Sequence, residues 1–195
     1  MGIDAAVERQ IGEQLDAGDL KAAASSIVRA YGPQLLGYLR AILPGDAADE
    51  AFAVFCEFLW TGLPGFRRES AALTWSYHLA WGAARRILED PFRRRAEVLS
   101  SGAAAELVAE ARTTTAAHLK AETARGLEAL RAELDIEEQT LLVLRVDRDL
   151  SWSDIARVVE DDESTAVQAR LRKRYERLVD KIRTLARERG LLPKP

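Results

Sequence analysis

The sequence predicts an all-α fold of two small helical domains joined by a low-complexity linker, with a helix-turn-helix in the second domain. Apolar residues recur at steps of three and four, the period of a helix that buries one face. No stretch of the chain indicates a strand. Residues 96–121 are rich in Ser, Thr and Ala and hold few large apolar residues, which is typical of a linker.

The composition fits a soluble globular protein and limits how it can bind nucleic acid. The chain has 195 residues, of which 48% are hydrophobic and 30% charged, enough for one large domain or two small ones. A formal net charge of -3 predicts that any contact with nucleic acid comes from local basic patches.

Cysteine usage and hydropathy predict a cytoplasmic protein that contacts no membrane. Cys56, the single cysteine, lies among apolar residues and is expected to be a buried filler. A lone cysteine makes no intramolecular disulfide, as is usual in a reducing cytoplasm. No apolar run approaches the ~20 residues that span a membrane, and the polar start of the chain is unlike a signal peptide.

Residues 1–26 predict an N-terminal helical extension that packs on the following helices, with a break near Gly18-Asp19. Its apolar positions have helical spacing: Val7, Ile11, Leu15 and Leu20. Residues 27–95 predict a first domain of three helices. The first should run from Ile27 to Leu43, interrupted early by Pro33, and Asp46 should cap the second.

Aromatic residues and arginines alternate through the loop 62–70 and the third helix of this domain: Phe66, Arg67, Arg68, Trp75, Tyr77, Trp81, Arg85 and Arg86. Arginines can hold phosphates while an aromatic side chain or a loop pocket takes an unstacked base. The pattern alone favours the plainer interpretation, in which the aromatics are core and the arginines form a solvated face.

Residues 122–195 predict the helix-turn-helix domain. A helix over 122–134 leads into a second helix, capped by Asp135 with Glu138 in a capping box. Ser151 should cap the third helix, and an acidic stretch over 160–163 separates it from a long fourth helix.

The long fourth helix has one apolar face and one basic face. The apolar positions are Val167, Leu171, Tyr175, Leu178, Ile182 and Leu185. The basic positions are Arg170, Arg172, Lys173, Arg174, Arg177, Lys181, Arg183 and Arg187. Short helices followed by a longer cationic one fit a unit that lays its last helix in a DNA groove.

No catalytic, metal or cofactor site is evident, so we expect a protein that is not an enzyme. The two histidines, His78 and His118, have no Cys, Asp or His partner at metal-ligand spacing, and His78 should be a face or core residue of its helix. Glu137 and Glu138 lie at a helix N-terminus, where capping and the helix dipole explain them.

Two groups of motifs, in the right order, match one protein family. Residues 134–159 follow its pattern without a gap, including Leu150-Ser151-Trp152-Ser153-Asp154-Ile155-Ala156. Residues 60–70 match its Trp, Leu-Pro, Phe-Arg and Glu-Ser positions, and Thr74-Trp75 matches its Thr-Trp pair. On these residues, the chain resembles the extracytoplasmic-function (ECF) group of bacterial sigma factors over about residues 27–95 and 122–187.

The resemblance implies a promoter-specificity subunit whose partners are core RNA polymerase and promoter DNA. The second helix of the first domain would bind the polymerase clamp helices through Asp49, Glu50, Ala53, Val54 and Glu57. The loop after it, Gly65 to Ser70, would melt the -10 element and hold a flipped-out base. The positions near this DNA would be Phe66, Arg67, Arg68, Trp75, Arg85 and Arg86. The resemblance also allows for an anti-sigma factor, since many members are held inactive by such a partner.

The second domain would read the -35 element in the major groove, and two registers of its last helix are open. One register places Ala166 to Leu171 at the DNA. The other treats Glu163 to Ala169 as extra loop or helix extension and starts base reading at Arg170. We favour the second, because it brings basic residues to the groove: Arg170, Arg172, Lys173, Arg174 and Arg177.

Three segments depart from the family pattern. Ala53-Val54 replaces a polar Gln-Glu pair, Ala80-Trp81-Gly82 replaces Ala-Arg-Asn, and the acidic turn 160–163 with Ser164 replaces Gly-hydrophobic-Ser. A second interpretation is therefore a sigma-like regulator or adaptor that keeps the fold but has lost promoter recognition. A plain helix-turn-helix repressor is weaker, since it ignores the match over residues 60–75.

Overall fold

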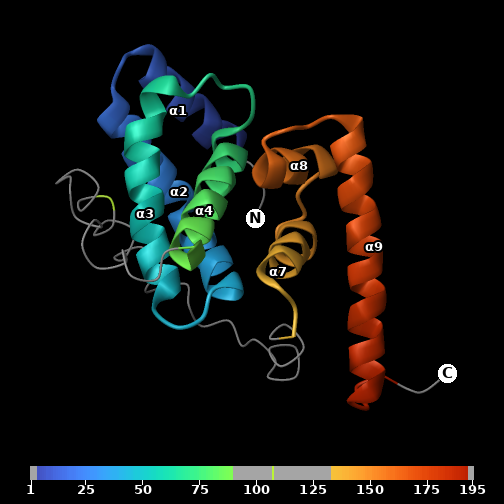
Figure 1. The fold of residues 1–195 in the computed structure, drawn as a ribbon. Coiled ribbons are helices and arrows are strands. Elements are labelled where there is room, and N and C mark those ends of the chain that lie inside the picture. The colour runs from blue at the N-terminus through green and yellow to red at the C-terminus, as the bar shows by residue number, and fades with distance from the viewer. Residues whose placement is uncertain (1–3, 90–106, 108–132, 193–195) are drawn as a thin grey trace.

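The computed structural model describes residues 4–89, 107 and 133–192, and every regular element within them is helical (Figure 1). The all-α prediction is confirmed for this part of the chain. The predicted linker, apart from Leu107, the predicted helix up to residue 132 and His118 lie outside the described residues. The division into two domains stays a prediction.

The chain begins with two antiparallel helices, α1 (Ala5–Asp16) and α2 (Leu20–Ile42). The predicted break is confirmed: Gly18 has φ +72°, a conformation that costs glycine little, and Asp19 caps α2. Two expectations were wrong. Pro33 lies inside α2 without ending it, and the boundary drawn at residue 26 cuts through that helix. Buried apolar residues on both sides of Pro33 hold the helix together despite the lost hydrogen bond.

Helix α3 (Ala47–Gly62) continues into a 3-10 turn, η1 (Leu63–Gly65), and a loop leads to α4 (Ala72–Glu89). Asp46 occupies the N-cap position of α3, but its side chain makes no capping hydrogen bond, contrary to prediction. Its backbone is helical (φ -75°, ψ -9°), whereas a capping side chain normally needs an extended backbone to reach the first free amides.

The C-terminal part comprises α7 (Ile136–Leu142), the π-helical η3 (Val143–Asp147), α8 (Trp152–Glu160) and α9 (Thr165–Glu188). The predicted capping box of Asp135 and Glu138 is confirmed, and so is the cap that Ser151 provides for α8. Ser164 caps α9 in the same way. These local caps fix where α7, α8 and α9 begin.

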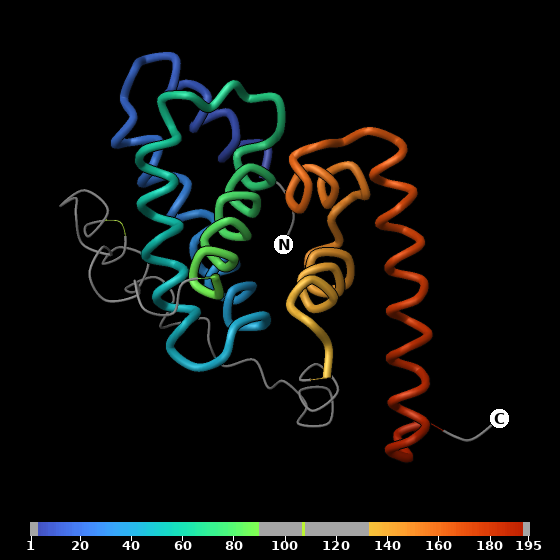
Figure 2. Tube along the Cα trace, viewed as in Figure 1, coloured from blue at the N-terminus to red at the C-terminus, as the bar shows by residue number. Residues whose placement is uncertain are grey.

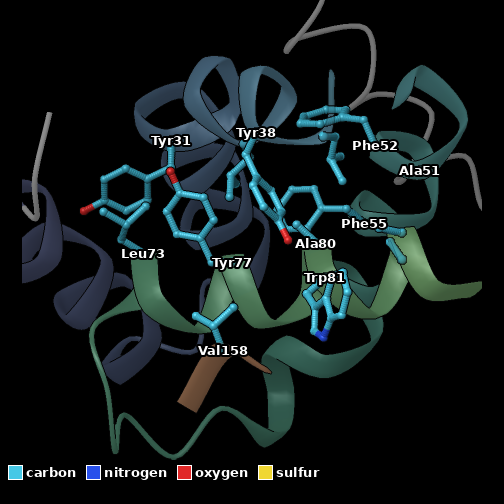
Figure 3. Close-up of a cluster of buried hydrophobic side chains, with 14 of the residues drawn as sticks. Tyr31, Tyr38, Ala51, Phe52, Phe55, Leu73, Tyr77, Ala80, Trp81 and Val158 are labelled. Carbon is cyan, nitrogen blue, oxygen red and sulfur yellow. The ribbon is translucent and has the colours of Figure 1, made fainter. Parts of the chain in front are cut away.

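One continuous buried cluster includes residues from α1–α4 and from the C-terminal helices (Figure 3). Tyr38 and Tyr77 pack edge to face, with ring centroids 5.4 Å apart. Val158 of α8 lies against α4, near Tyr77. The trace in Figure 2 shows α8 beside the N-terminal half of α4, and α9 on the outer side of α7 and α8. The two sequence regions thus share a core.

Cys56 is confirmed as a buried filler, since its side chain is 0% exposed. Desolvation raises the pKa of its thiol from 9.0 to about 12. We therefore expect native protein to leave this thiol unreacted with Ellman's reagent at pH 8, and unfolded protein to release one equivalent. Because the raised pKa applies only to the folded state, this group should lower stability as pH rises from about 9 toward 12. Rapid reaction of the native chain at pH 8 would contradict the burial.

Candidate nucleic-acid interface

The loop between η1 and α4 presents an aromatic stack. Phe66 and Trp75 lie nearly parallel, with ring centroids 4.5 Å apart and an interplanar angle of 18°. A Cβ added to Gly62 would come within 3.3 Å of the Trp75 ring, so glycine allows the indole to approach α3 closely. Both rings are half-buried. The structure thus brings together two of the residues predicted to lie near DNA.

The two arginines of this loop already have carboxylate partners. Arg67 is 78% exposed and lies 3.1 Å from a carboxylate oxygen of Glu69. Arg68 adopts φ +57° and pairs with Asp16 at the end of α1, at 2.5 Å. The hydrogen bond from Arg68 lowers the pKa of the Asp16 carboxyl. Sequence analysis missed Asp16, because nothing in the N-terminal extension marked it as a partner of a loop 52 residues away.

Helix α4 is capped from outside its own sequence. Glu8 of α1 accepts hydrogen bonds from the backbone N–H groups of Ala72 (2.8 Å) and Leu73 (3.2 Å). It also accepts one from the Tyr31 hydroxyl at 2.7 Å. One sequence signal was available: Ala71 precedes the helix and cannot cap it, so the free amides needed another acceptor. Glu8 therefore fixes the start of the helix that carries Trp75.

Arg85 and Arg86 lie in the last turns of α4, about 20 Å along the helix from the loop. Arg85 is 3.4 Å from Glu89, and the Arg86 guanidinium lies 5.7 Å from the Phe58 ring centroid. The structure therefore does not bring these two arginines together with Phe66 and Trp75.

The predicted polymerase-contact positions on α3 differ in exposure. Asp49, Glu50, Ala53 and Glu57 are half-buried, and Asp49 pairs with Arg40 at 3.0 Å. Val54 is 4% exposed and belongs to the core. Since its side chain is covered, Val54 cannot form part of a contact surface in this structure.

The basic face of α9 is exposed along its first half. The helix begins at Thr165, so residues 165–169 are its first turns, and the option of an extra loop there is wrong. Val167 and Leu171 point into the core. Exposed basic side chains follow at Arg170, Arg172, Lys173 and Arg177. Arg174 instead ties α9 to α7 by pairing with Glu137 at 2.5 Å and Asp135 at 3.8 Å.

Two of the four carboxylates in the acidic turn 160–163 pair with arginines of the protein. Glu160 pairs with Arg170 at 3.2 Å, and Glu163 pairs with Arg157 at 3.0 Å. Asp162 accepts a hydrogen bond from the Ser164 backbone N–H at 2.8 Å. These partners reduce the repulsion that the turn would exert on a nearby phosphate.

A polar contact, which we call the seam, joins α4 and the loop before it to α8. The Thr74 hydroxyl donates to Asp154 at 2.9 Å, and His78 Nδ1 lies 3.1 Å from the Val158 carbonyl. Arg157, 19% exposed, lies between Glu69 and Glu163, and its hydrogen bond with Glu163 raises its pKa. His78 is thus half-buried with a structural partner, as expected.

A second contact joins α2 to α7 and to the residues after η3, and some polar atoms there lack hydrogen-bond partners within the described part of the chain. The Tyr38 hydroxyl meets Thr140 at 3.4 Å, and a Cβ added to Gly37 would be 3.1 Å from Arg148 Nη2. Tyr77 Oη and Arg148 Nε are buried without a hydrogen-bond partner among the described residues. Water would satisfy such atoms if the contact opened.

No family model, curated protein or solved structure matches the chain. Within residues 4–89 and 133–192, no group of three or more His, Cys, Asp or Glu side chains could hold a metal ion. None of the described helices is long and apolar enough to cross a membrane.

Proposed function

We propose that the protein is an alternative sigma factor that binds core RNA polymerase and directs promoter-specific transcription initiation. One observation carries the proposal: the basic first half of α9 is exposed, and Ser151 and Ser164 cap the starts of α8 and α9. A cationic recognition helix held in this way suits the major groove. The proposed binding to core polymerase rests on the motif matches in both halves of the chain.

In this proposal, the loop from Gly65 to Ser70 acts on the -10 element. Arg67 and Arg68 pair with exposed carboxylates, and solvent and salt screen such surface ion pairs so that they hold only weakly. Phosphates of the DNA strand can therefore replace Glu69 and Asp16 at low cost. The Phe66–Trp75 stack offers an aromatic face for an unstacked base.

The loop and α9 must move apart if they are to bind the -10 and -35 elements at the same time. Positions -35 and -10 are about 85 Å apart on B-DNA, whereas a compact chain of this length has a radius of gyration of about 16 Å. The seam holds the loop and α8 side by side. The chain from 90 to 132 could reach up to about 140 Å if extended, so its length permits separation. We therefore propose that the seam opens when the protein engages a promoter.

Run-off transcription with purified core polymerase, over a promoter library from the source genome, tests the proposal. We expect start sites that share a pair of upstream elements, and the -35 consensus would fix the reading register of α9. A chain that binds core polymerase but starts no transcript would favour the adaptor instead. The buried Val54 and the carboxylate partners of Arg68 and Arg170 are the observations that favour this second function.

Replacing Arg172 and Lys173 by alanine should weaken duplex binding and reduce its salt dependence. Each lost phosphate contact should lower the slope of log K against log salt by about 0.9, so the double variant should lose nearly two units. The measurement is fluorescence anisotropy with a 30-base-pair duplex at 50–200 mM salt.

The matched control removes two exposed arginines, Arg183 and Arg187, from the far end of the same helix, about 20 Å away. Its net charge changes by the same amount, but its slope of log K against log salt should stay near that of the parent chain. Equal slopes for both variants would rule out the proposed DNA-facing half of α9.

A further inference from the structure

Trp152, the first residue of α8, contacts two arginines, one from η3 and one from α9. The Arg145 guanidinium carbon is 5.3 Å from the indole centroid, and that of Arg172 is 5.9 Å from it. Tyr175 meets the same ring edge-on, with centroids 5.6 Å apart at 70°. The indole is half-buried, so it is fixed by packing and still reaches the surface.

The two arginines differ in how else they are held. Arg145 donates to the Leu150 carbonyl at 2.8 Å and lies 3.8 Å from Asp149. Arg172 is exposed and makes one long hydrogen bond, 3.4 Å, to the Gln168 side chain one turn earlier. A long exposed bond of this kind restrains an arginine weakly. The indole is thus the main restraint on the Arg172 guanidinium among these contacts.

We propose that Trp152 is a positioning residue that holds Arg172 ready for a DNA phosphate; this inference rests on the proposed function. A guanidinium within about 6 Å of an aromatic ring is attracted to its face. Its remaining N–H donors can still form paired hydrogen bonds with a phosphate. Because the side chain is already ordered, less conformational entropy is lost when DNA binds. Arg145, on the same ring, adds positive charge beside it.

The test is a double-mutant cycle of Trp152→Leu and Arg172→Ala, measured with the full chain on the 30-base-pair duplex. Trp152→Leu should lower affinity about three- to tenfold and reduce the salt slope by about 0.9, as Arg172→Ala does. The double variant should bind no more weakly than Arg172→Ala alone, because Trp152 acts through that arginine. Trp152→Phe keeps an aromatic face and should stay within about twofold of the parent.

Thermal unfolding of each variant separates positioning from a fold defect. If Trp152→Leu unfolds, Trp152→Phe and Trp152→Met still compare an aromatic with an aliphatic side chain of similar bulk. Additive losses in the cycle, or an unchanged salt slope for Trp152→Leu, would overturn the positioning role and leave the proposed function intact. If the parent chain fails to bind the duplex and starts no transcript with core polymerase, the proposed function fails and the inference with it.

Discussion

Glu8→Ala is expected to lower the free energy of unfolding by about 3 kcal/mol and to loosen α1 from the start of α4. The Glu8 carboxylate accepts hydrogen bonds from Tyr31, Ala72 and Leu73. Hydrogen bonds to a charged group contribute about 1.5–3 kcal/mol each, and their loss is partly offset when water reaches the freed donors. Urea denaturation followed by circular dichroism measures the change. Hydrogen exchange should show faster exchange of the Ala72 and Leu73 amides.

Glu13→Ala is the matched control, since Glu13 is an exposed glutamate on the same helix. It should change stability by less than about 0.5 kcal/mol. Glu8→Gln retains one acceptor oxygen and should fall between the two. Equal stabilities for Glu8→Ala and Glu13→Ala would show that the long-range cap does not form in solution.

Locking the seam should reduce promoter-directed transcription at least tenfold. Glu69 and Arg157 face each other across it at 3.6 Å and both side chains reach the surface, so cysteines at these positions can be joined by a reducible cross-linker in a Cys56→Ala background. The cross-link would keep the proposed -10 and -35 readers side by side. Since they could not span about 85 Å of duplex, only one element could be bound at a time. Run-off transcription before and after reduction measures the effect.

Two controls accompany the locked chain. The same double variant without cross-linker gives the cost of losing the ion pairs of Arg157 with Glu69 and Glu163. A cross-link between cysteines at Asp180 and Arg183, an exposed pair one turn apart within α9, reproduces the chemistry without joining the two halves. Full activity of the chain locked at the seam would refute the proposed separation.

Sequence analysis succeeded where the determining contacts are local. The capping box of Asp135 and Glu138 spans three residues, and so does the contact of Ser151 with Asp154, so the helix starts could be derived from spacing. Pro33 was misjudged because a local rule for helix breaking was applied where the tertiary burial of α2 decides.

The candidate site could be predicted only in part, because its partners come from distant segments. Glu8 lies 64 residues from the amide that it caps, and Thr74 lies 80 residues from Asp154. Spacing in a single sequence carries no information on such pairs. The exposed face of α9 was foreseen from its periodicity, whereas the contact between Trp152 and Arg172 depends on how α8 crosses α9.

The guanidinium of Arg157 links the loop before α4 to the turn before α9. Its guanidinium is 3.6 Å from Glu69 in the loop and 3.0 Å from Glu163 in the turn before α9. If DNA binds as proposed, a phosphate that displaces Glu69 would leave Arg157 paired with Glu163 alone, so binding at the loop would alter the free energy of binding at α9. Thermodynamic linkage makes this effect mutual: binding at α9 would change the affinity of the loop by the same factor by which binding at the loop changes the affinity of α9.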